Sequence, residues 1–186
     1  MDQRALVERA ANGDRDAFGV LVRASATRLD AAAWLILRDR ELTRDAVQET
    51  LIRAWRDLPR LRDPDRFDAW LHRLLVHAAI DEARRRSRRV IEVELTAVEA
   101  PTRDQGIASL ADRDALSRVL AGLAPEHRAL VVLHYYLGVP LPEAATSLGI
   151  SLSAAKSRLH RAITTLRKSL TAEPDRSAVS LGEGKA

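Results

Sequence analysis

The segment LPEAATSLGISLSAAKSRLHR, residues 141–161, carries the most specific local pattern in the chain. Pro142 suits the first turn of a helix, where its missing N–H removes no hydrogen bond. Gly149 supplies the left-handed conformation that ends a helix, and Ser151 is a favourable N-cap for the next one. The segment therefore predicts a short helix, a tight turn and a second helix, which is the arrangement of a helix-turn-helix.

The second of these helices is expected to have one apolar and one basic face. Between 151 and 170 there are five cations and no acid, as suits a helix that enters the major groove of DNA. The apolar stripe comprises Leu152, Ala155, Leu159, Ile163 and Leu166. The side chains expected to contact DNA are Ser153, Lys156, Ser157, Arg158, His160 and Arg161. A solvated basic face on an ordinary helical hairpin is the alternative, which the preceding capped helix and Gly turn make less favourable.

The composition of the whole chain favours an all-α protein. Of 186 residues only 8 are Gly and 7 are Pro, while Ala, Leu and Arg, all strong helix formers, are abundant. Because the chain has no cysteine, disulfides, thiolate metal sites and cysteine nucleophiles are excluded. No apolar run approaches the roughly 20 residues that cross a bilayer, and the charged N-terminus is unlike a signal peptide. We expect a soluble, cytoplasmic protein without membrane insertion.

Three further helical stripes of apolar residues occupy the first half of the chain, at 18–36, 46–55 and 67–78. We expect the large aromatic side chains Trp34 and Trp55 to pack in the core. These stripes predict a bundle of helices in the N-terminal half.

The boundaries of the middle helix follow from two local signals. Thr43 is expected to cap its N-terminus, and the helix should stop at Leu58, because Pro59 disfavours helical geometry in the preceding residue. Beyond it, the sequence Asp63-Pro64-Asp65 is typical of a turn.

The helical pattern weakens between residues 90 and 113. Five acids face two cations there, and Pro101 and Gly106 interrupt the segment, as is typical of a flexible or extended linker. Apolar residues alternate with acids at 91–95, a pattern that would also allow a short strand without a partner. The predicted organisation is a helical domain over 1–89, a flexible acidic linker over 90–113, a helix-turn-helix domain over 114–170 and a disordered tail over 171–186.

Five arginines fall within the six positions 84–89. This density disfavours burial and suits a polyanion, since each neutralised phosphate releases counterions. A solvated helix C-terminus is the alternative, but it explains one or two arginines more easily than five. Upstream, Phe67 and Trp70 lie close to the basic loop 60–66, where aromatic rings would support unstacked bases; packing in the core is the alternative for both.

Six short motifs together resemble the extracytoplasmic-function sigma factors of bacterial RNA polymerase. Three resemble region two of that family, namely Asp45-Ala-Val-Gln-Glu-Thr50, Phe67-Asp-Ala-Trp-Leu71 and Asp81-Glu-Ala-Arg84. Three resemble region four, namely Leu123-Ala-Pro-Glu-His-Arg128, Leu148-Gly-Ile-Ser151 and Lys156-Ser-Arg-Leu-His-Arg161. The resemblance covers about residues 14 to 170, in the family's order and with a linker between the two regions.

The resemblance implies a promoter-specificity subunit that is not an enzyme, needs no cofactor and binds core RNA polymerase and promoter DNA. A dedicated anti-sigma factor is a further partner common in the family. Docking on the clamp helices of the largest polymerase subunit would involve Asp45, Gln48, Glu49 and Arg53. Contacts to the −10 element, including a flipped base, would involve Arg62, Asp63, Arg66, Phe67, Trp70, His77, Asp81, Arg84, Arg85 and Arg88. The predicted recognition helix would contact the −35 element as duplex.

Three positions depart from the family's usual pattern. His77 stands where the family usually has Asn, and Val76 where Arg is common. Since neutral His offers one donor and one acceptor where Asn offers more, the preference for the flipped base is expected to differ. Ala145 replaces a usual Ile in the first helix of the turn motif, where we expect looser packing within the same fold.

Two other classes of protein are alternatives to this family. An autonomous helix-turn-helix regulator would use the C-terminal block alone and leave the motifs at 45–50 and 84–89 without a role. A metal-dependent hydrolase or nuclease lacks a Gly-rich phosphate loop and an HExxH motif. His72 and His77 are five residues apart and project from different faces of a helix, so an enzyme is the less favoured class.

Overall fold

The computed structural model describes residues 2–94, 120 and 122–172, and every regular element within these ranges is helical. The α-helices are α1 (Gln3–Ala11), α2 (Arg15–Leu37), α3 (Arg40–Asp57), α4 (Phe67–Glu94), α6 (Pro125–Val131), α7 (Leu141–Ser147) and α8 (Leu152–Ala172). Shorter turns are η1 (Leu58–Arg60) and η2 (Pro64–Arg66), which are 3-10 helices, and η3 (Val132–Tyr136), which is π-helical. The all-α prediction is confirmed. Most of the expected linker and tail lies outside the described residues.

Aspartate side chains cap the first three helices. Asp2 accepts from the Arg4 amide, Asp14 accepts from two amides at the start of α2, and Asp39 accepts from the Leu42 amide. A carboxylate also complements the positive end of the helix dipole. The prediction that Thr43 caps α3 is wrong, because Asp39 already begins the helix and Thr43 is buried within it.

The end of α3 follows the proline rule. The helix ends at Asp57 with Leu58 as its C-cap, and Pro59 falls in the tighter turn η1. The predicted turn at 63–65 is confirmed as η2, where the Asp63 side chain accepts from the Asp65 amide.

The long helix α4 differs from expectation at its C-terminal end. It runs for 28 residues to Glu94, so the backbone stays helical at 90–94 and the short strand considered there is wrong for these residues. The acids and β-branched residues in this stretch weaken the apolar periodicity, yet no Gly or Pro interrupts the chain before Pro101. Once a helix is nucleated, each added residue gains a hydrogen bond, so α4 propagates past the end of its apolar stripe.

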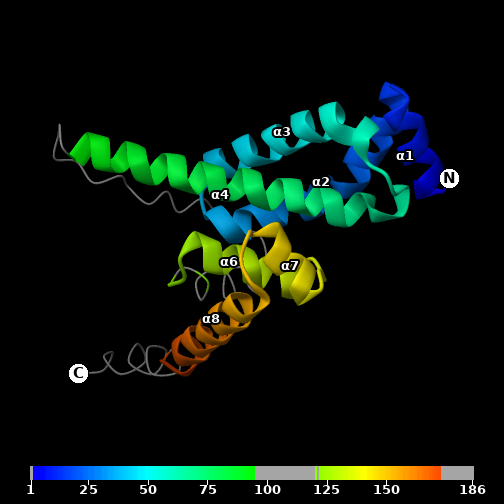
Figure 1. The fold of residues 1–186 in the computed structure, drawn as a ribbon. Coiled ribbons are helices and arrows are strands. Elements are labelled where there is room, and N and C mark those ends of the chain that lie inside the picture. Colours follow the sequence, from blue (N-terminus) through cyan, green and yellow to red (C-terminus); the bar gives the residue numbers. More distant parts are fainter. Residues whose placement is uncertain (1, 95–119, 121, 173–186) are drawn as a thin grey trace, which may run out of the picture.

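The N-terminal helices α1 to α4 pack around a shared core, in which α2, α3 and α4 lie side by side (Figure 1). Alanines 32, 33, 46 and 54 are fully buried where α2 and α3 meet their neighbours, which lets these helices approach closely. Trp34 and Trp55 are only half-buried, a partial departure from the prediction that both pack in the core. The Trp55 ring packs at 5.0 Å between centroids on that of Phe18.

The C-terminal helices α6, α7 and α8 extend the same hydrophobic core, whose buried residues form one continuous cluster from α1 to α8. The C-terminal helices contribute Leu130, Leu133, Ala144, Ala155 and Ala162 to this cluster. In Figure 1, α6 and α7 lie against the α2–α4 face of the N-terminal helices, and α8 leads away from them. Among the described residues, none of the helices combines the length and the apolar character that crossing a membrane requires.

Candidate nucleic-acid and polymerase interfaces

The turn between α7 and α8 has the predicted geometry. Gly149 adopts φ +64°, a left-handed conformation that costs other residues free energy. The Ser151 hydroxyl accepts from the Ala154 amide at 3.2 Å and so caps α8. Ala145 is buried beneath the turn. These local interactions direct α8 away from α7 as a helix-turn-helix.

The outward face of α8 carries the residues predicted to contact the −35 element. Ser153, Lys156, Ser157, His160 and Arg161 are all exposed, whereas Arg158 is half-buried at the flank of this face. The helix is held to its domain by Ala155, Leu159 and Ala162, of which Ala162 was missing from the predicted stripe. Leu152, which the predicted apolar stripe included, is the first residue of α8 and is 39% exposed.

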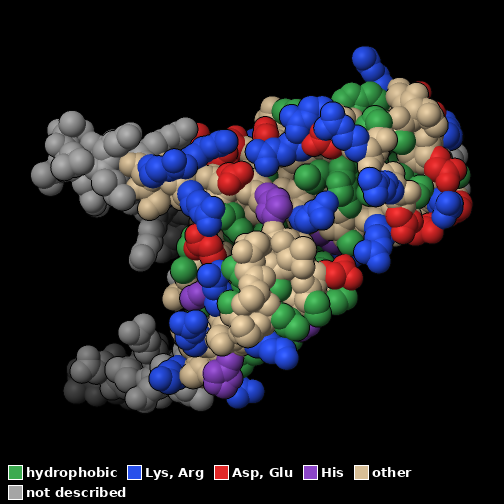
Figure 2. Space-filling view, in the orientation of Figure 1, with side chains coloured by type: hydrophobic (Ala, Val, Ile, Leu, Met, Phe, Trp, Pro, Cys, Tyr) green, Lys and Arg blue, Asp and Glu red, His purple; other side chains and the backbone are tan. Residues whose placement is uncertain are grey.

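The C-terminal part of α4 presents the predicted arginine cluster to solvent. Arg84, Arg85 and Arg88 are exposed, while Arg86 turns inward and bonds to Asp39 at the start of α3. In Figure 2, Lys and Arg side chains gather along this length of α4 and again around α8. Arg85 nevertheless donates to Glu82 at 2.6 Å, and Arg84 lies 3.5 Å from a carboxylate oxygen of Glu126 on α6, so these two exposed arginines also have acidic partners.

The residues around the start of α4 divide between surface and core. Arg62, Asp63 and Arg66 are exposed in the preceding loop, and Trp70 is half-buried. Phe67 is 1% exposed, so its ring packs in the core, as the alternative interpretation expected. In this arrangement the ring is not accessible for stacking on a base. Phe67 instead supports Trp70, with 6.0 Å between ring centroids.

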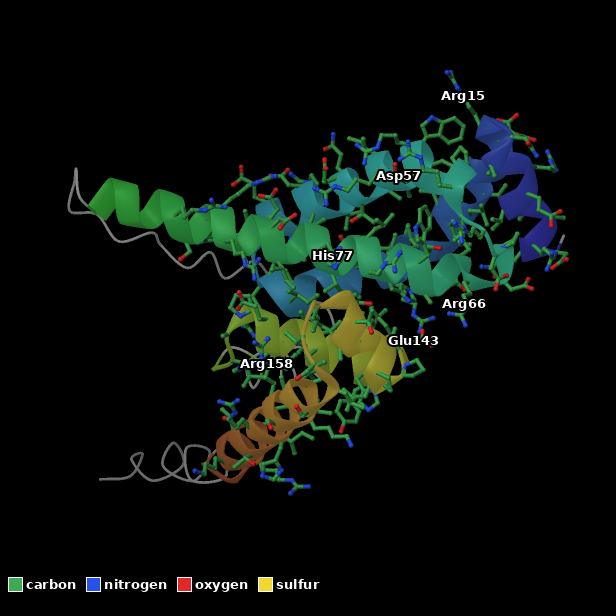
Figure 3. The ribbon with its side chains drawn as sticks, in the orientation of Figure 1. Arg15, Asp57, Arg66, His77, Glu143 and Arg158 are labelled. Carbon is green, nitrogen blue, oxygen red and sulfur yellow. The ribbon has the colours of Figure 1, made fainter. Side chains whose placement is uncertain are left out.

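Two predicted −10 residues on α4 already have protein partners. His77 Nε2 donates to the backbone carbonyl of Ser147 on α7, and Figure 3 shows His77 on the length of α4 above α7. Asp81 lies 3.7 Å from a guanidinium nitrogen of Arg53 on α3. The sequence offered no signal for the His77 contact, since its partner is a backbone carbonyl distant in the chain.

The polar residues of α3 predicted to dock on polymerase are not equivalent. Asp45 and Gln48 are exposed, and neither side chain makes a hydrogen bond within the described residues. Glu49 instead accepts from Arg53 Nε at 2.6 Å. The structure thus leaves Asp45 and Gln48 available to a partner and uses Arg53 to connect α3 with α4.

An apolar groove of about 520 Å³ adjoins Gln48 between α2 and α3. Its lining residues are Asp30, Arg44, Val47, Gln48, Leu51, Ile52 and Trp55. Sequence reasoning missed this groove. Its signal is Ile52, which falls off the apolar stripe of α3, is 53% exposed, and lies beside Val47 and Trp55 in the lining of the groove.

His72 is a buried imidazole on α4 that the DNA-binding hypothesis does not use. Burial, and secondarily the charge of Arg28, lower the pKa of His72 from 6.5 to about 4, although Asp68 acts in the opposite direction. Below pH 6.5 the His72 imidazole is protonated in the unfolded chain, whereas in the folded chain it stays neutral until the pH falls to about 4. Folding is therefore favoured above pH 6.5 and progressively less so as the pH falls toward 4.

We expect the free energy of unfolding to fall by about 3 kcal/mol through this group as the pH drops from 6.5 to 4. Urea unfolding measured across this range, for the protein and for His72→Gln, gives the difference. The variant should lose most of this pH dependence, whereas His160→Gln, which removes an exposed imidazole from α8, should retain it. An equal pH dependence in the protein and His72→Gln would contradict the assignment.

The described residues contain no group of three or more His, Asp or Glu side chains placed to hold a metal ion. His72 and His77 do not form a common site, because His72 is buried in the core and His77 contacts the Ser147 carbonyl on α7. Within these residues the basic surfaces, the groove and the exposed face of α3 are therefore the candidate sites.

Comparison with known proteins identifies two regions of one family in this chain. Residues 21–89 match the family model of sigma-70 region 2, and residues 113–166 match that of sigma-70 region 4. These matches cover the N-terminal helices that carry the arginine cluster and the helix-turn-helix, in the order that the motifs predict.

Whole-chain relatives agree with this division. The chain is 34% identical over 168 residues to the ECF RNA polymerase sigma factor SigL of Mycobacterium tuberculosis H37Rv, covering 86% of this chain and 94% of SigL. It is 32% identical to the RNA polymerase sigma factor CnrH of Cupriavidus metallidurans, covering 93% of this chain and 96% of CnrH. A probable sigma factor, RfaY of Xanthomonas campestris, is 29% identical, but the chain spans only 46% of its length.

Solved structures show the same fold. The structure of CnrH in complex with the cytosolic domain of CnrY superposes with a TM-score of 0.65 at 31% identity, covering 92% of this chain and 98% of that one. The sigma factor RpoE from Bartonella quintana, solved with the anti-sigma factor NepR, gives a TM-score of 0.66 at 24% identity over 84% of this chain, a likeness of fold. With both regions in order and whole-chain relatives above 30% identity, this protein belongs to the extracytoplasmic-function family of RNA polymerase sigma factors.

Proposed function

We propose that the chain binds core RNA polymerase and directs it to promoters through two DNA-binding surfaces, one on each half. The observation that carries this is the exposed basic face of α8, which is presented by a capped helix-turn-helix. That face occurs in the same chain as the exposed arginines of α4. Two separated basic surfaces suit two separated elements of one promoter, since each neutralises its own set of phosphates.

In this proposal α8 recognises the −35 element in the major groove. Ser153, Ser157 and His160 lie at the centre of its exposed face, with Lys156 and Arg161 on either side. Arginine and lysine there contact guanine edges or phosphates, and serine serves either. Arg158 contributes from the flank, where half of its side chain is covered.

The N-terminal half would engage the −10 element along α4 and the loop before it. Trp70 is half-buried in the first turn of α4, close in sequence to the exposed Arg66 and Asp63, so we assign it a stacking contact with a base while the loop contacts the backbone. His77 and Asp81 line the next turns toward the arginine cluster. The phosphate contacts are assigned to Arg62, Arg84, Arg85 and Arg88.

Docking on the clamp helices of the polymerase is assigned to the exposed face of α3. Asp45 and Gln48 provide direct contacts, while Glu49 and Arg53 form an ion pair at the edge of the same face. The adjoining groove with Ile52 adds apolar surface to this region. We infer a cytoplasmic initiation factor without catalytic activity of its own, because its partners are polymerase and promoter DNA.

An anti-sigma factor is a further proposed partner. CnrH and RpoE were both solved in complex with partners of this kind, the cytosolic domain of CnrY and NepR respectively. The alternative of an autonomous regulator is not favoured, because it leaves the whole region-two half, which matches its own family model, without a role.

In vitro transcription with core polymerase on a genomic library tests the proposal. The chain should create initiation sites that core polymerase alone lacks, and Asp45→Arg should reduce co-purification with core polymerase about tenfold, because it reverses an exposed docking charge. Asp16→Arg, the same change in the first turn of α2, is the control. Unaltered initiation sites, or symmetric binding of duplex DNA without polymerase, would contradict the proposed function.

A further inference from the structure

The first helix, α1, lies outside both regions that match the family models. The region-2 match begins at residue 21, whereas α1 ends at Ala11. Yet α1 contacts both η1 and η2, the two short turns between α3 and α4, and Figure 1 shows it beside this connection. We call residues 58–66, which contain both turns, the −10 loop. A helix to which the family match assigns no role is therefore packed against the loop that the proposed function assigns to DNA.

Apolar packing gives α1 a fixed place beside the start of the −10 loop. Leu6, Val7 and Ala10 are buried on one face of α1. Leu58, the first residue of η1, is 0% exposed, and all four side chains belong to one cluster of buried residues. Because burial of these side chains is favourable, the position of α1 against the loop does not depend on its polar contacts.

Arg4 on α1 makes a polar contact with the second turn of the −10 loop. Its Nη1 donates to a carboxylate oxygen of Asp65 on η2 at 2.8 Å, although the two residues are 61 positions apart in the chain. Its Nε donates to Glu8, one turn further along α1, at 3.1 Å. The charge of Asp65, followed by that of Glu8, raises the pKa of Arg4. The planar guanidinium can bind two carboxylates at once, so Arg4 is held by its own helix while it holds the loop.

Asp65 belongs to the hydrogen bonds that shape η2. Its backbone amide donates to Asp63 Oδ1 at 3.1 Å, and the Arg66 amide donates to the Asp63 carbonyl at 3.1 Å. Asp63 and Arg66 are both assigned to the −10 element, and they share one short turn with Asp65. A displacement of Asp65 would therefore move both of these side chains.

We propose that Arg4 is a positioning residue for the −10 element, because its contact with Asp65 fixes the loop that presents Asp63 and Arg66 to a base. The inference rests on the proposed function, which assigns this loop to DNA; Arg4 itself does not contact DNA in it. Discrimination between bases needs side chains held to within a fraction of an ångström by their supporting contacts. The pair is 50% and 63% exposed, so its loss should alter the loop without unfolding the helices.

Two variants remove the contact while changing the net charge in opposite directions. Arg4→Gln removes a positive charge, and Asp65→Asn removes a negative one. A general effect of charge would weaken DNA binding in the first and strengthen it in the second, whereas loss of the contact should reduce base discrimination in both. Arg9→Gln is the matched control for Arg4→Gln, because it removes another exposed arginine of α1, one that pairs with Asp14 at 2.7 Å and not with the loop.

Base discrimination is measured by in vitro transcription with core polymerase on promoters randomised over the −10 element, with one −35 element throughout. The readout is the ratio of transcript yields between the most and the least preferred base at each position. Arg4→Gln and Asp65→Asn should each lower this ratio about threefold at one position or more, as suits the loss of an exposed ion pair. Arg4→Lys, which keeps the charge, should restore part of the ratio, and Arg9→Gln should match the parent.

The double variant Arg4→Gln, Asp65→Asn tests whether the two residues act through one contact. It should lose no more discrimination than either single variant, since the contact can be removed only once. Losses that add in the double variant would mean that the two side chains act separately, and would overturn the proposal.

Hydrogen exchange of the free chain tests the positioning step without DNA. The amides of Leu61, Asp65 and Arg66 donate within the −10 loop. In Arg4→Gln and in Asp65→Asn they should exchange about threefold faster, while amides in the middle of α4 should exchange as in the parent. Unchanged exchange in the loop would overturn the positioning role, even with discrimination reduced.

The transcription results separate failure of this inference from failure of the proposed function. Initiation that depends on the chain, with the same base preferences in the parent, Arg4→Gln and Asp65→Asn, would overturn the role of Arg4 alone. Opposite changes in overall yield with intact preferences would do the same, because they reflect charge only. Absence of chain-dependent initiation in the parent would instead contradict the proposed function.

Discussion

Replacing Arg84, Arg85 and Arg88 together with Gln should weaken binding of single-stranded promoter DNA on the order of a hundredfold, because each exposed guanidinium loses a charge-assisted contact. All three side chains are exposed on α4, whereas Arg86 is bonded to Asp39 and is left in place. The slope of log K against log salt should fall by about 2, since each phosphate contact on a single strand contributes about 0.7.

The salt titration distinguishes a phosphate surface from a structural effect. Arg15, Arg23 and Arg56 are also exposed on α2 and α3 and lie outside the α4 cluster, so their joint replacement with Gln makes the same change in net charge. This control should leave the slope nearly intact and reduce affinity far less. An equal slope in both triple variants would mean that the arginines of α4 do not lie near phosphates.

Ser157→Glu should abolish recognition of the −35 element, with a loss of about a hundredfold in affinity for duplex promoter DNA. Ser157 lies at the centre of the exposed face of α8, opposite the buried Ala155 and Ala162. A carboxylate there meets phosphates and acceptor-rich base edges, and such like-charge contacts cost several kcal/mol.

Competition between specific and scrambled duplexes provides the measurement, with transcription from a −35-dependent promoter as a second readout. Ala26→Glu adds the same charge to the exposed surface of α2 and should change both readouts little. A helical circular-dichroism spectrum matching the parent excludes unfolding as the cause. Full retention of specific binding by Ser157→Glu would place the −35 contacts elsewhere.

The local signals along the chain predicted much of the fold. The Gly149 turn and the Ser151 cap depend on residues within a few positions of each other, as does the stop of α3 before Pro59. These features can be predicted from the sequence because the residues that form each of them lie close together in the chain. The same holds for the exposed face of α8, which follows from the spacing of the buried Ala155 and Leu159.

The missed features depend on partners that are distant in the chain. The Asp39 carboxylate, which displaced Thr43 as the cap of α3, also bonds to Arg86 on α4. The His77 contact is made to a backbone carbonyl 70 residues away, which no side-chain pattern can indicate. The half-burial of Trp55 likewise depends on the groove between α2 and α3. The exposure of this side chain is therefore set by the packing of the two helices and cannot be predicted from the apolar periodicity of α3 alone.

Arg53 has a consequence for exchanging parts between related proteins. Its guanidinium bonds to Glu49 on α3 and lies 3.7 Å from Asp81 on α4, so one side chain belongs both to the proposed docking helix and to the proposed DNA helix. A chimaera that transplants α3 alone would leave Asp81 facing a foreign residue. Engineers who seek orthogonal transcription circuits should therefore swap α3 and α4 as one cassette.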